Sequence, residues 1–158
     1  MNQAHLATTT TERSWLIFYL ASQAYAVPLT QVSEVIRDGE VTPVPGAAAD
    51  LLGIHHLRGR IVPVLDGRLR LGLSGDVVVD VAGTRIVVLS YRGHLVGLRV
   101  DAVGDLLDVG GQTEAPPPGR AVRSDDPVKA VVPWRDGFVA LLDVRRMCRL
   151  SEELELVA

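Results

Sequence analysis

Cysteine and aromatic residues are scarce in this chain. Cys148 is the only cysteine in 158 residues, so no disulfide can form within the chain, and a single thiol suits a reducing compartment. Aromatic residues make up 4% of the sequence, whereas hydrophobic residues make up 47%. The core must therefore consist of Val, Leu, Ile and Ala, and the β-branched residues among these favour strands.

Strong charge of one sign and long apolar segments are also lacking. The formal net charge is −3, and no apolar stretch approaches the roughly 20 residues of a membrane span. Residues 1–13 have neither a basic start nor an apolar segment, so they do not look like a signal peptide and are expected to form a disordered leader. We therefore expect a soluble, cytoplasmic protein that does not insert into a membrane.

Nucleic-acid binding normally requires a concentrated basic patch. The one local basic run consists of Arg58, Arg60, Arg68 and Arg70. Acidic residues outnumber basic ones, 19 to 16, and few aromatic side chains are available to stack on bases. A small barrel of the oligonucleotide-binding type is therefore an alternative that the composition does not favour.

The most informative pattern is an internal repeat. Two apolar segments joined by a short turn occupy residues 15–29, and a second unit of the same kind begins at Ile86. In this alignment Glu34 corresponds to Asp105, 71 positions further along the chain. A repeat of this length predicts two similar supersecondary units within one molecule.

A second pair of matching segments extends the repeat. Gly59–Arg68 and Gly137–Arg145 each contain an apolar run that ends in an aspartate, and these aspartates, Asp66 and Asp143, lie 77 positions apart. Each stands where the N-cap of a short helix is expected, so both are interpreted as structural residues rather than as catalytic carboxylates. Frequent short strands and glycine turns then predict two small antiparallel barrels, one from each copy.

Several elements are predicted from local patterns. Hairpins are expected near 15–29, 53–65, 85–100 and 129–142. Short helices are expected at Thr30–Arg37, Ala47–Leu52 and Gly67–Leu71, and from Asp143 to Leu150. A further strand is expected at Val77–Val81, and residues 110–126, which contain three consecutive prolines, are expected to form an irregular connection.

Five segments of the chain share the pattern of one family: Tyr25–Arg37, Val41–Gly53, Leu52–Leu73, Leu95–Val109 and Gly137–Met147. In this order they resemble the CheW family of chemotaxis coupling proteins, and the resemblance covers about Trp15 to Leu150. The signature Leu-Arg-Gly is present at 57–59. Three positions depart from the family's pattern: His56 replaces its usual Asn, His55 its usual Val or Ile, and Gly67 its common Leu. These departures bear on the identity of the partner more than on the fold.

The resemblance implies a fold and a function. The fold would be mainly β, with two small five-stranded SH3/OB-like β-barrels that share a hydrophobic core and carry short helices. A single domain would span 14–150, and 151–158 would be a tail or a helix extension. The protein would be a non-catalytic adaptor without a cofactor. It would couple the cytoplasmic tip of a chemoreceptor to the regulatory domain of a CheA-type histidine kinase, in chemotaxis or a related motility pathway, and would join array or ring assemblies.

The resemblance also suggests partner-binding residues in the first copy. Arg58 would be a charged anchor at an interface, although a solvated turn arginine is the plain alternative. Gly59 would allow the positive φ of the turn. Glu34 would lie on a contact surface, or be an ordinary surface carboxylate, and Val32 would be either core or an exposed apolar contact.

Three further positions match family positions near the groove between the barrels. They are Ile86, Gly97 and Leu106. Plain core packing is the alternative for Ile86 and Leu106, and relief of crowding within a strand is the alternative for Gly97.

Catalytic and metal sites find little support. His55 and His56 are adjacent in a predicted strand, so their side chains point to opposite faces and cannot chelate one ion together. A small hydrolase using His55, His56 or Asp66 would need converging titratable groups, and no spacing in the sequence predicts them. The expectation is no enzyme activity and no metal.

Overall fold

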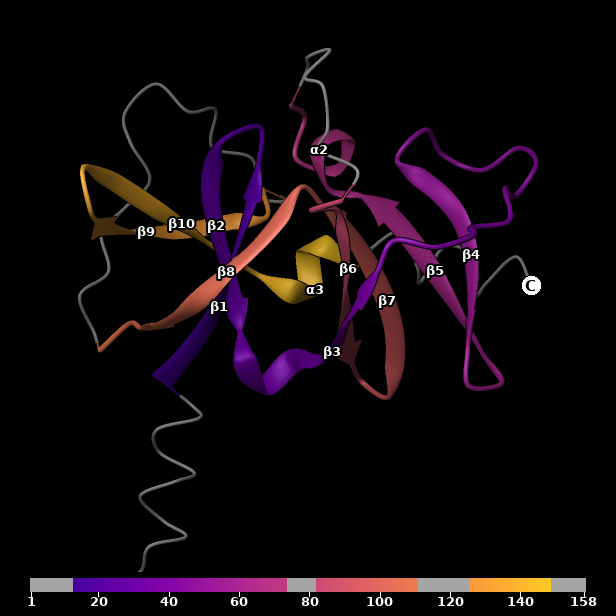
Figure 1. The fold of residues 1–158 in the computed structure, drawn as a ribbon, viewed down its shortest axis with the longest axis horizontal. Coiled ribbons are helices and arrows are strands. Elements are labelled where there is room, and N and C mark those ends of the chain that lie inside the picture. Colours follow the sequence, from indigo (N-terminus) through magenta and orange to yellow (C-terminus); the bar gives the residue numbers. More distant parts are fainter. Residues whose placement is uncertain (1–12, 74–81, 111–125, 149–158) are drawn as a thin grey trace, which may run out of the picture.

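A computed structural model describes residues 13–73, 82–110 and 126–148 of the chain. These residues form two five-stranded sheets, which lie side by side with two short helices between them (Figure 1). Sheet A has the order β8-β1-β2-β10-β9 and sheet B the order β3-β6-β7-β5-β4. In sheet A the strands are β1 (Ser14–Leu20), β2 (Gln23–Pro28), β8 (Ala102–Asp108), β9 (Val128–Trp134) and β10 (Gly137–Leu142). In sheet B they are β3 (Val32–Arg37), β4 (Leu51–Leu57), β5 (Arg60–Asp66), β6 (Arg85–Tyr91) and β7 (His94–Val100).

The repeat is present, but the two copies exchange strands. β3 of the first copy pairs with β6 of the second, and β8 of the second pairs with β1 of the first. β5 and β10 also cross over, and each lies parallel to a strand of the other copy. Each sheet therefore contains strands from both copies, and the prediction of one barrel per copy is wrong in this respect. The strand exchange ties the two copies into one folding unit.

Strand alternation explains how the sheets share a core. In β1, Leu16, Phe18 and Leu20 face a cluster that contains residues of both sheets. The intervening Trp15 and Ile17 face a second cluster made by sheet A alone. Because side chains alternate between the two faces of a strand, the continuous apolar run of β1 buries both faces. A third cluster belongs to sheet B, with Ile86 and Val88 of β6 in it.

The separate clusters show that each sheet is curled. Sheet A's own cluster has Leu107 of edge strand β8 packed against it and includes Val132 of the opposite edge strand β9. Sheet B's own cluster is covered by Ile36 of β3 and Leu52 of β4, again from opposite edges. A flat sheet could not bring its two edges to one cluster, so both sheets adopt the barrel-like form that was predicted.

The predicted helix at Thr30–Arg37 is wrong. Only Leu29–Gln31 forms a single turn of 3₁₀ helix, η1, and Val32–Arg37 is strand β3. Burial in β3 alternates strictly between half-buried and exposed residues, which is the pattern of an edge strand. Val32, Val35 and Ile36 have helical spacing, but β-branched side chains pack better on a pleated strand than on a helix.

The other short helices follow the two equivalent aspartates. Helix α2 spans Gly67–Arg70, and Asp66 caps it by accepting from the backbone N–H groups of Arg68 and Leu69. Helix α3 spans Val144–Met147 and is capped by Asp143. The N-cap interpretation is confirmed for both aspartates. No helix forms at Ala47–Leu52: the N–H of Leu51 donates to the carbonyl of Ala48 over 3.1 Å in a single tight turn, and β4 begins at Leu51.

Some predictions lie outside the described residues. These are the strand at Val77–Val81, most of the connection at 110–126, the end of the C-terminal helix and the tail at 151–158. Of the predicted leader, Arg13 is described: its carbonyl accepts from the backbone N–H of Val109. In the parts of the chain that the structure covers, no helix has the length and apolar character needed to span a membrane.

Candidate functional site

The Arg58–Gly59 turn joins β4 to β5. Leu57 pairs with Arg60, and the two residues between them have φ values of 50° and 80°. Two positive φ values in a two-residue loop define a type I′ hairpin, which matches the twist of the flanking strands. A Cβ on Gly59 would have no neighbour within 4 Å, so glycine is needed there for its backbone conformation and not for space.

Arg58 itself is an unusual residue for this turn position. A non-glycine residue in the left-handed region costs about 1–2 kcal/mol. Arg92 and Arg135 also adopt positive φ at hairpin turns, at 51° and 52°, so the backbone alone does not distinguish Arg58. The side-chain contact does.

Arg58 forms a bidentate ion pair with Glu34. Its Nη1 and Nη2 atoms donate to the two carboxylate oxygens of Glu34, each over 3.1 Å. The Arg58 side chain is 78% exposed and the Glu34 side chain 22% exposed. β3 and the β4–β5 hairpin are the opposite edges of sheet B, so the pair closes the open side of that sheet. The fork geometry fixes the orientation of the exposed guanidinium.

Val32 lies two residues before Glu34 in β3, and a register shift between them places Val32 opposite Leu89 and Glu34 opposite Val88 of β6. Val32 is half-buried and packs against the shared core. Val32, Glu34, Arg58 and Gly59 therefore belong to one end of sheet B, and we call these four residues the sheet B cluster.

Ile86 and Gly97 lie inside sheet B. Ile86 is fully buried in the hydrophobic core of sheet B. This corresponds to the core alternative. A Cβ on Gly97 would lie 2.8 Å from Cγ2 of Ile86 and 3.3 Å from Cγ2 of Val64. Gly97 thus makes room for two buried side chains. Both positions can affect a partner only through the packing beneath the surface.

Leu106 lies on the other sheet, on edge strand β8, and is 56% exposed. Its core alternative is therefore wrong. Leu106 belongs to neither of the groups above, since β8 and β3 are edges of different sheets. The structure thus distributes the seven predicted residues over a surface cluster, a buried pair and a separate exposed leucine.

Sequence reasoning missed four large exposed apolar residues, Val35, Ile61, Leu69 and Phe138. The repeat could have revealed all of them except Leu69. Val35 corresponds to Leu106 at the offset of 71 positions, and Ile61 corresponds to Phe138 at the offset of 77. Each sheet therefore exposes the same two repeat positions as large apolar side chains.

The basic run does not form a free patch. Arg58 is paired with Glu34, and Arg60 donates to the carbonyl of Gly93 over 3.2 Å. Arg68 is paired with Asp101 over 2.6 Å. Arg70 donates to the carbonyls of Arg146 and Met147. With all four guanidinium groups bound within the chain, the feature that suggested nucleic acid loses its support.

The residues considered for catalysis do not converge. Nδ1 of His55 lies 3.1 Å from the carbonyl oxygen of Glu40, whereas His56 follows on the other face of β4 and is exposed. Asp66 is engaged as a helix cap. A hollow of about 290 Å³ near Tyr25 and Phe138 is lined by apolar residues, Gln23 and Tyr25, without a charged side chain or histidine. Within the described ranges, no three His, Cys, Asp or Glu side chains are grouped so that they could hold a metal ion.

Comparison with known protein families shows to which family the chain belongs. The family model described as "CheW-like domain" matches residues 14–152. The chain belongs to the CheW-like family. As a CheW-like protein it is a chemotaxis coupling adaptor, and the resemblance noted in the sequence is confirmed.

Individual CheW proteins resemble the chain over most of its length. The chemotaxis protein CheW of Bacillus subtilis is 30% identical over 134 residues, which cover 84% of this chain and 85% of the relative. The chemotaxis protein CheW of Klebsiella aerogenes is 29% identical over 153 residues, which cover 96% of this chain and 90% of the relative. The crystal structure of the scaffolding protein TtCheW from Thermoanaerobacter tengcongensis superimposes with a TM-score of 0.76 at 26% identity, covering 86% of this chain and 87% of that one.

Proposed function

We propose that this chain joins the cytoplasmic tip of a chemoreceptor to the regulatory domain of a CheA-type histidine kinase, without catalysing a reaction itself. The mechanism is binding at two places on one rigid body. Receptor state then influences the kinase because both are held at a fixed spacing. Such a protein acts in the cytoplasm, where both partners present the relevant surfaces.

The observation that carries this proposal is the exposed Arg58 side chain held by Glu34 on sheet B, together with the separate exposed Leu106 on sheet A. An arginine held by a carboxylate and exposed over most of its side chain is suited to an interface anchor, because its orientation is fixed before the partner arrives. Leu106 offers an apolar contact on a different sheet. Two unlike contact regions on two sheets suit an adaptor with two partners.

We propose that the sheet B cluster is one contact region and that β8 around Leu106 belongs to the other. The buried pair Ile86 and Gly97 would act indirectly, by holding the shape of sheet B. Interfaces of the transient kind bury little surface, and assembly into arrays or rings would strengthen them through effective concentration.

The test is a binding assay with purified partners from the same genome. The chain is titrated against the regulatory domain of the CheA-type kinase and, separately, against receptor cytoplasmic fragments, by calorimetry or interferometry. The proposal expects saturable binding to both, and a ternary complex on gel filtration when all three are mixed. Binding of only one partner, or mutually exclusive binding of the two, would contradict it.

A further inference from the structure

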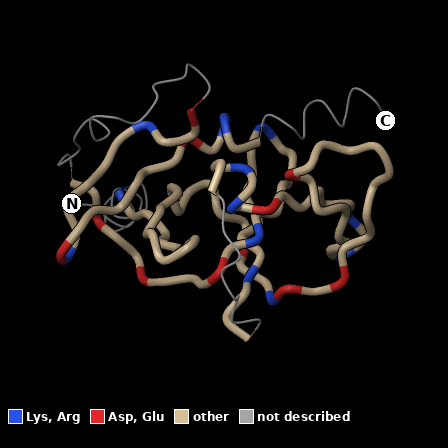
Figure 2. The backbone as a smooth tube through the Cα atoms, turned by 90° about the horizontal axis from the view of Figure 1, so that it is seen from above, with Lys and Arg blue, Asp and Glu red and all other residues tan. Residues whose placement is uncertain are grey.

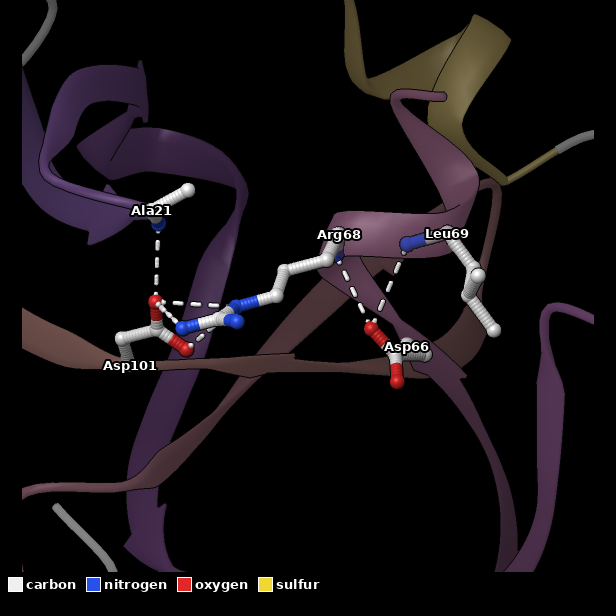
Figure 3. Close-up of polar contacts among 5 residues, drawn as sticks. All are labelled: Ala21, Asp66, Arg68, Leu69 and Asp101. Atoms are coloured by element: carbon white, nitrogen blue, oxygen red, sulfur yellow. Dashed lines mark hydrogen bonds and ion pairs between the residues drawn. The ribbon is translucent and has the colours of Figure 1, made fainter. Parts of the chain in front are cut away.

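A group of charged residues lies between the two sheets, away from the candidate contact residues. Figure 2 shows basic and acidic residues side by side in the middle of the molecule, between its two halves. The central contact is the pair formed by Arg68 of α2 and Asp101, which follows β7. Figure 3 shows the Arg68 side chain extending from α2 to the Asp101 carboxylate.

The contact between Arg68 and Asp101 is close and multiple. Nη2 of Arg68 donates to Oδ2 of Asp101 over 2.6 Å, and Nε donates to both carboxylate oxygens over 3.1 Å. The side chains are 14% and 22% exposed, so the pair is largely removed from water. Removing one partner of such a pair leaves a charge without compensation in a poorly hydrated place.

Asp101 stands where the chain crosses between the sheets. It follows the last residue of β7 in sheet B and precedes β8 in sheet A. Its carboxylate also accepts from the backbone N–H of Ala21 over 2.8 Å, and its own N–H donates to the carbonyl of Tyr19 over 3.0 Å. Both of these partners belong to the β1–β2 hairpin of sheet A.

Arg68, in contrast, is attached to sheet B. Helix α2 directly follows β5, and Asp66 at the end of β5 accepts from the backbone N–H of Arg68 over 2.9 Å (Figure 3). The backbone also approaches both sheets here, because a Cβ on Gly67 would lie 2.7 Å from the carbonyl oxygen of Arg99 and 2.9 Å from Cδ2 of Leu20. The Arg68–Asp101 pair thus connects the end of sheet B to the turn of sheet A.

Comparing the two copies of the repeat shows which contacts occur in both and which occur only at the Arg68–Asp101 pair. The aspartate N-cap occurs in both copies, at Asp66 and Asp143. The charged pair does not: the positions equivalent to Arg68 and Asp101, at the offsets of 77 and 71, are Arg145 and Thr30, and both are exposed. A contact that the fold needed in each copy would be expected in both. A pair present in one copy only is suited to setting a unique arrangement, which is the best-attested use of buried polar contacts.

We propose that Arg68 and Asp101 are positioning residues that fix the angle between the two sheets. On this account they touch neither partner. They hold the sheet B cluster and Leu106 at a constant spacing. The importance of this spacing rests on the proposed adaptor function, whereas the role of the pair in fixing the angle between the sheets does not.

The first experiment measures the angle without any partner. Cysteines introduced by Ser33→Cys on β3 and Asp136→Cys in the β9–β10 turn, both exposed, carry spin labels, and the distance distribution between them is recorded by electron resonance. The parent chain, whose Cys148 is buried, provides the labelling control. Arg68→Gln and Asp101→Asn are compared with Arg145→Gln, the matched variant at the equivalent exposed position.

The expected result is a widened or shifted distribution in Arg68→Gln and in Asp101→Asn, with native circular dichroism, and a parental distribution in Arg145→Gln. A parental distribution in whichever of the two variants folds overturns the proposal. Loss of folding in both also overturns it, because the pair would then be a requirement of the fold and not of sheet orientation.

The second experiment uses the reconstituted complex. Arg68→Gln should bind each partner separately within about threefold of the parent chain, as a substitution outside an interface does. Receptor control of kinase activity should nevertheless be lost. If the parent chain binds neither partner, the adaptor function fails and the distance measurement still decides the role of the pair. If binding to a single partner falls as far as the coupling does, Arg68 is a contact residue and the positioning role is wrong.

Discussion

The guanidinium of Arg58 and the carboxylate of Glu34 meet through two hydrogen bonds of 3.1 Å, although the residues lie on opposite edges of sheet B. The carboxylate is mostly covered, while the guanidinium remains open to solvent. The contact therefore closes a sheet and presents a fixed cation at the same time.

Arg58→Ala should weaken partner binding without unfolding the chain. An interface anchor contributes about 2 kcal/mol or more, which corresponds to a loss of roughly 30-fold in affinity. The effect on stability should stay below about 1 kcal/mol, because an ion pair this exposed contributes little. Titration against each purified partner and circular dichroism measure the two effects.

Arg92→Ala is the matched control for this variant. Arg92 occupies the same kind of turn with φ 51°, and its guanidinium lies 5.2 Å from the ring centroid of Tyr91; among the described residues, no carboxylate pairs with it. It should bind both partners as the parent chain does. Equal losses for Arg58→Ala and Arg92→Ala would mean that general surface charge, and not the Arg58 anchor, drives binding.

Leu106→Ser should reduce the binding of one partner and leave stability nearly unchanged. Leu106 is 56% exposed, so replacing it removes little buried surface from the folded chain. Leu69→Ser is the control, since Leu69 is 51% exposed but lies on α2, outside the predicted contacts. If both variants, or neither, lower the affinity in calorimetry, Leu106 has no particular place in the interface.

Gly97→Ala should destabilise the fold. The added Cβ would lie 2.8 Å from Cγ2 of the fully buried Ile86, and overpacking of this kind costs about 1–3 kcal/mol. Gly137→Ala should be nearly neutral, because no described residue beyond its chain neighbours has an atom within 4 Å of the added Cβ. Urea denaturation compares the free energies of unfolding, and equal midpoints for the two variants would show that Gly97 does not relieve crowding.

The two equivalent caps should differ in strength. Asp66 accepts from two backbone N–H groups, over 2.9 and 3.3 Å, whereas Asp143 accepts from one over 3.4 Å. Asp66→Ala should therefore lose more stability than Asp143→Ala, within the range of about 0.5–2 kcal/mol known for N-caps. Thermal denaturation of both variants measures the difference, and a larger loss for Asp143→Ala would contradict the geometry.

Local patterns predicted most of the strands, because their signals are local. The alternation and glycine turns around Arg58–Gly59 and Arg92–Gly93 are enough to define hairpins. The aspartates at 66 and 143 likewise predict where the helices α2 and α3 begin. The prediction for β3 was wrong because three apolar residues matched the helical period over a segment too short to distinguish a helix from a strand.

The relationships across the chain could not be predicted. The exchange of β3 and β8 between the sheets depends on pairings far apart in sequence, for which a single sequence carries no local signal. Glu34 and Arg58 were each named as candidates, but nothing in the sequence showed that they meet. The pair of Arg68 and Asp101 had no signal at all, since Arg68 belonged to a basic run that suggested a surface patch.

The central claim is that one chain couples receptor to kinase through two separate contact regions. The most direct test is reconstitution of the CheA-type kinase and a receptor fragment of the same genome, with and without this chain, while autophosphorylation is followed with labelled ATP. The account predicts that receptor signalling state changes the kinase rate only when the chain is present, and that Arg58→Ala abolishes this dependence. Receptor control of equal size without the chain would contradict it.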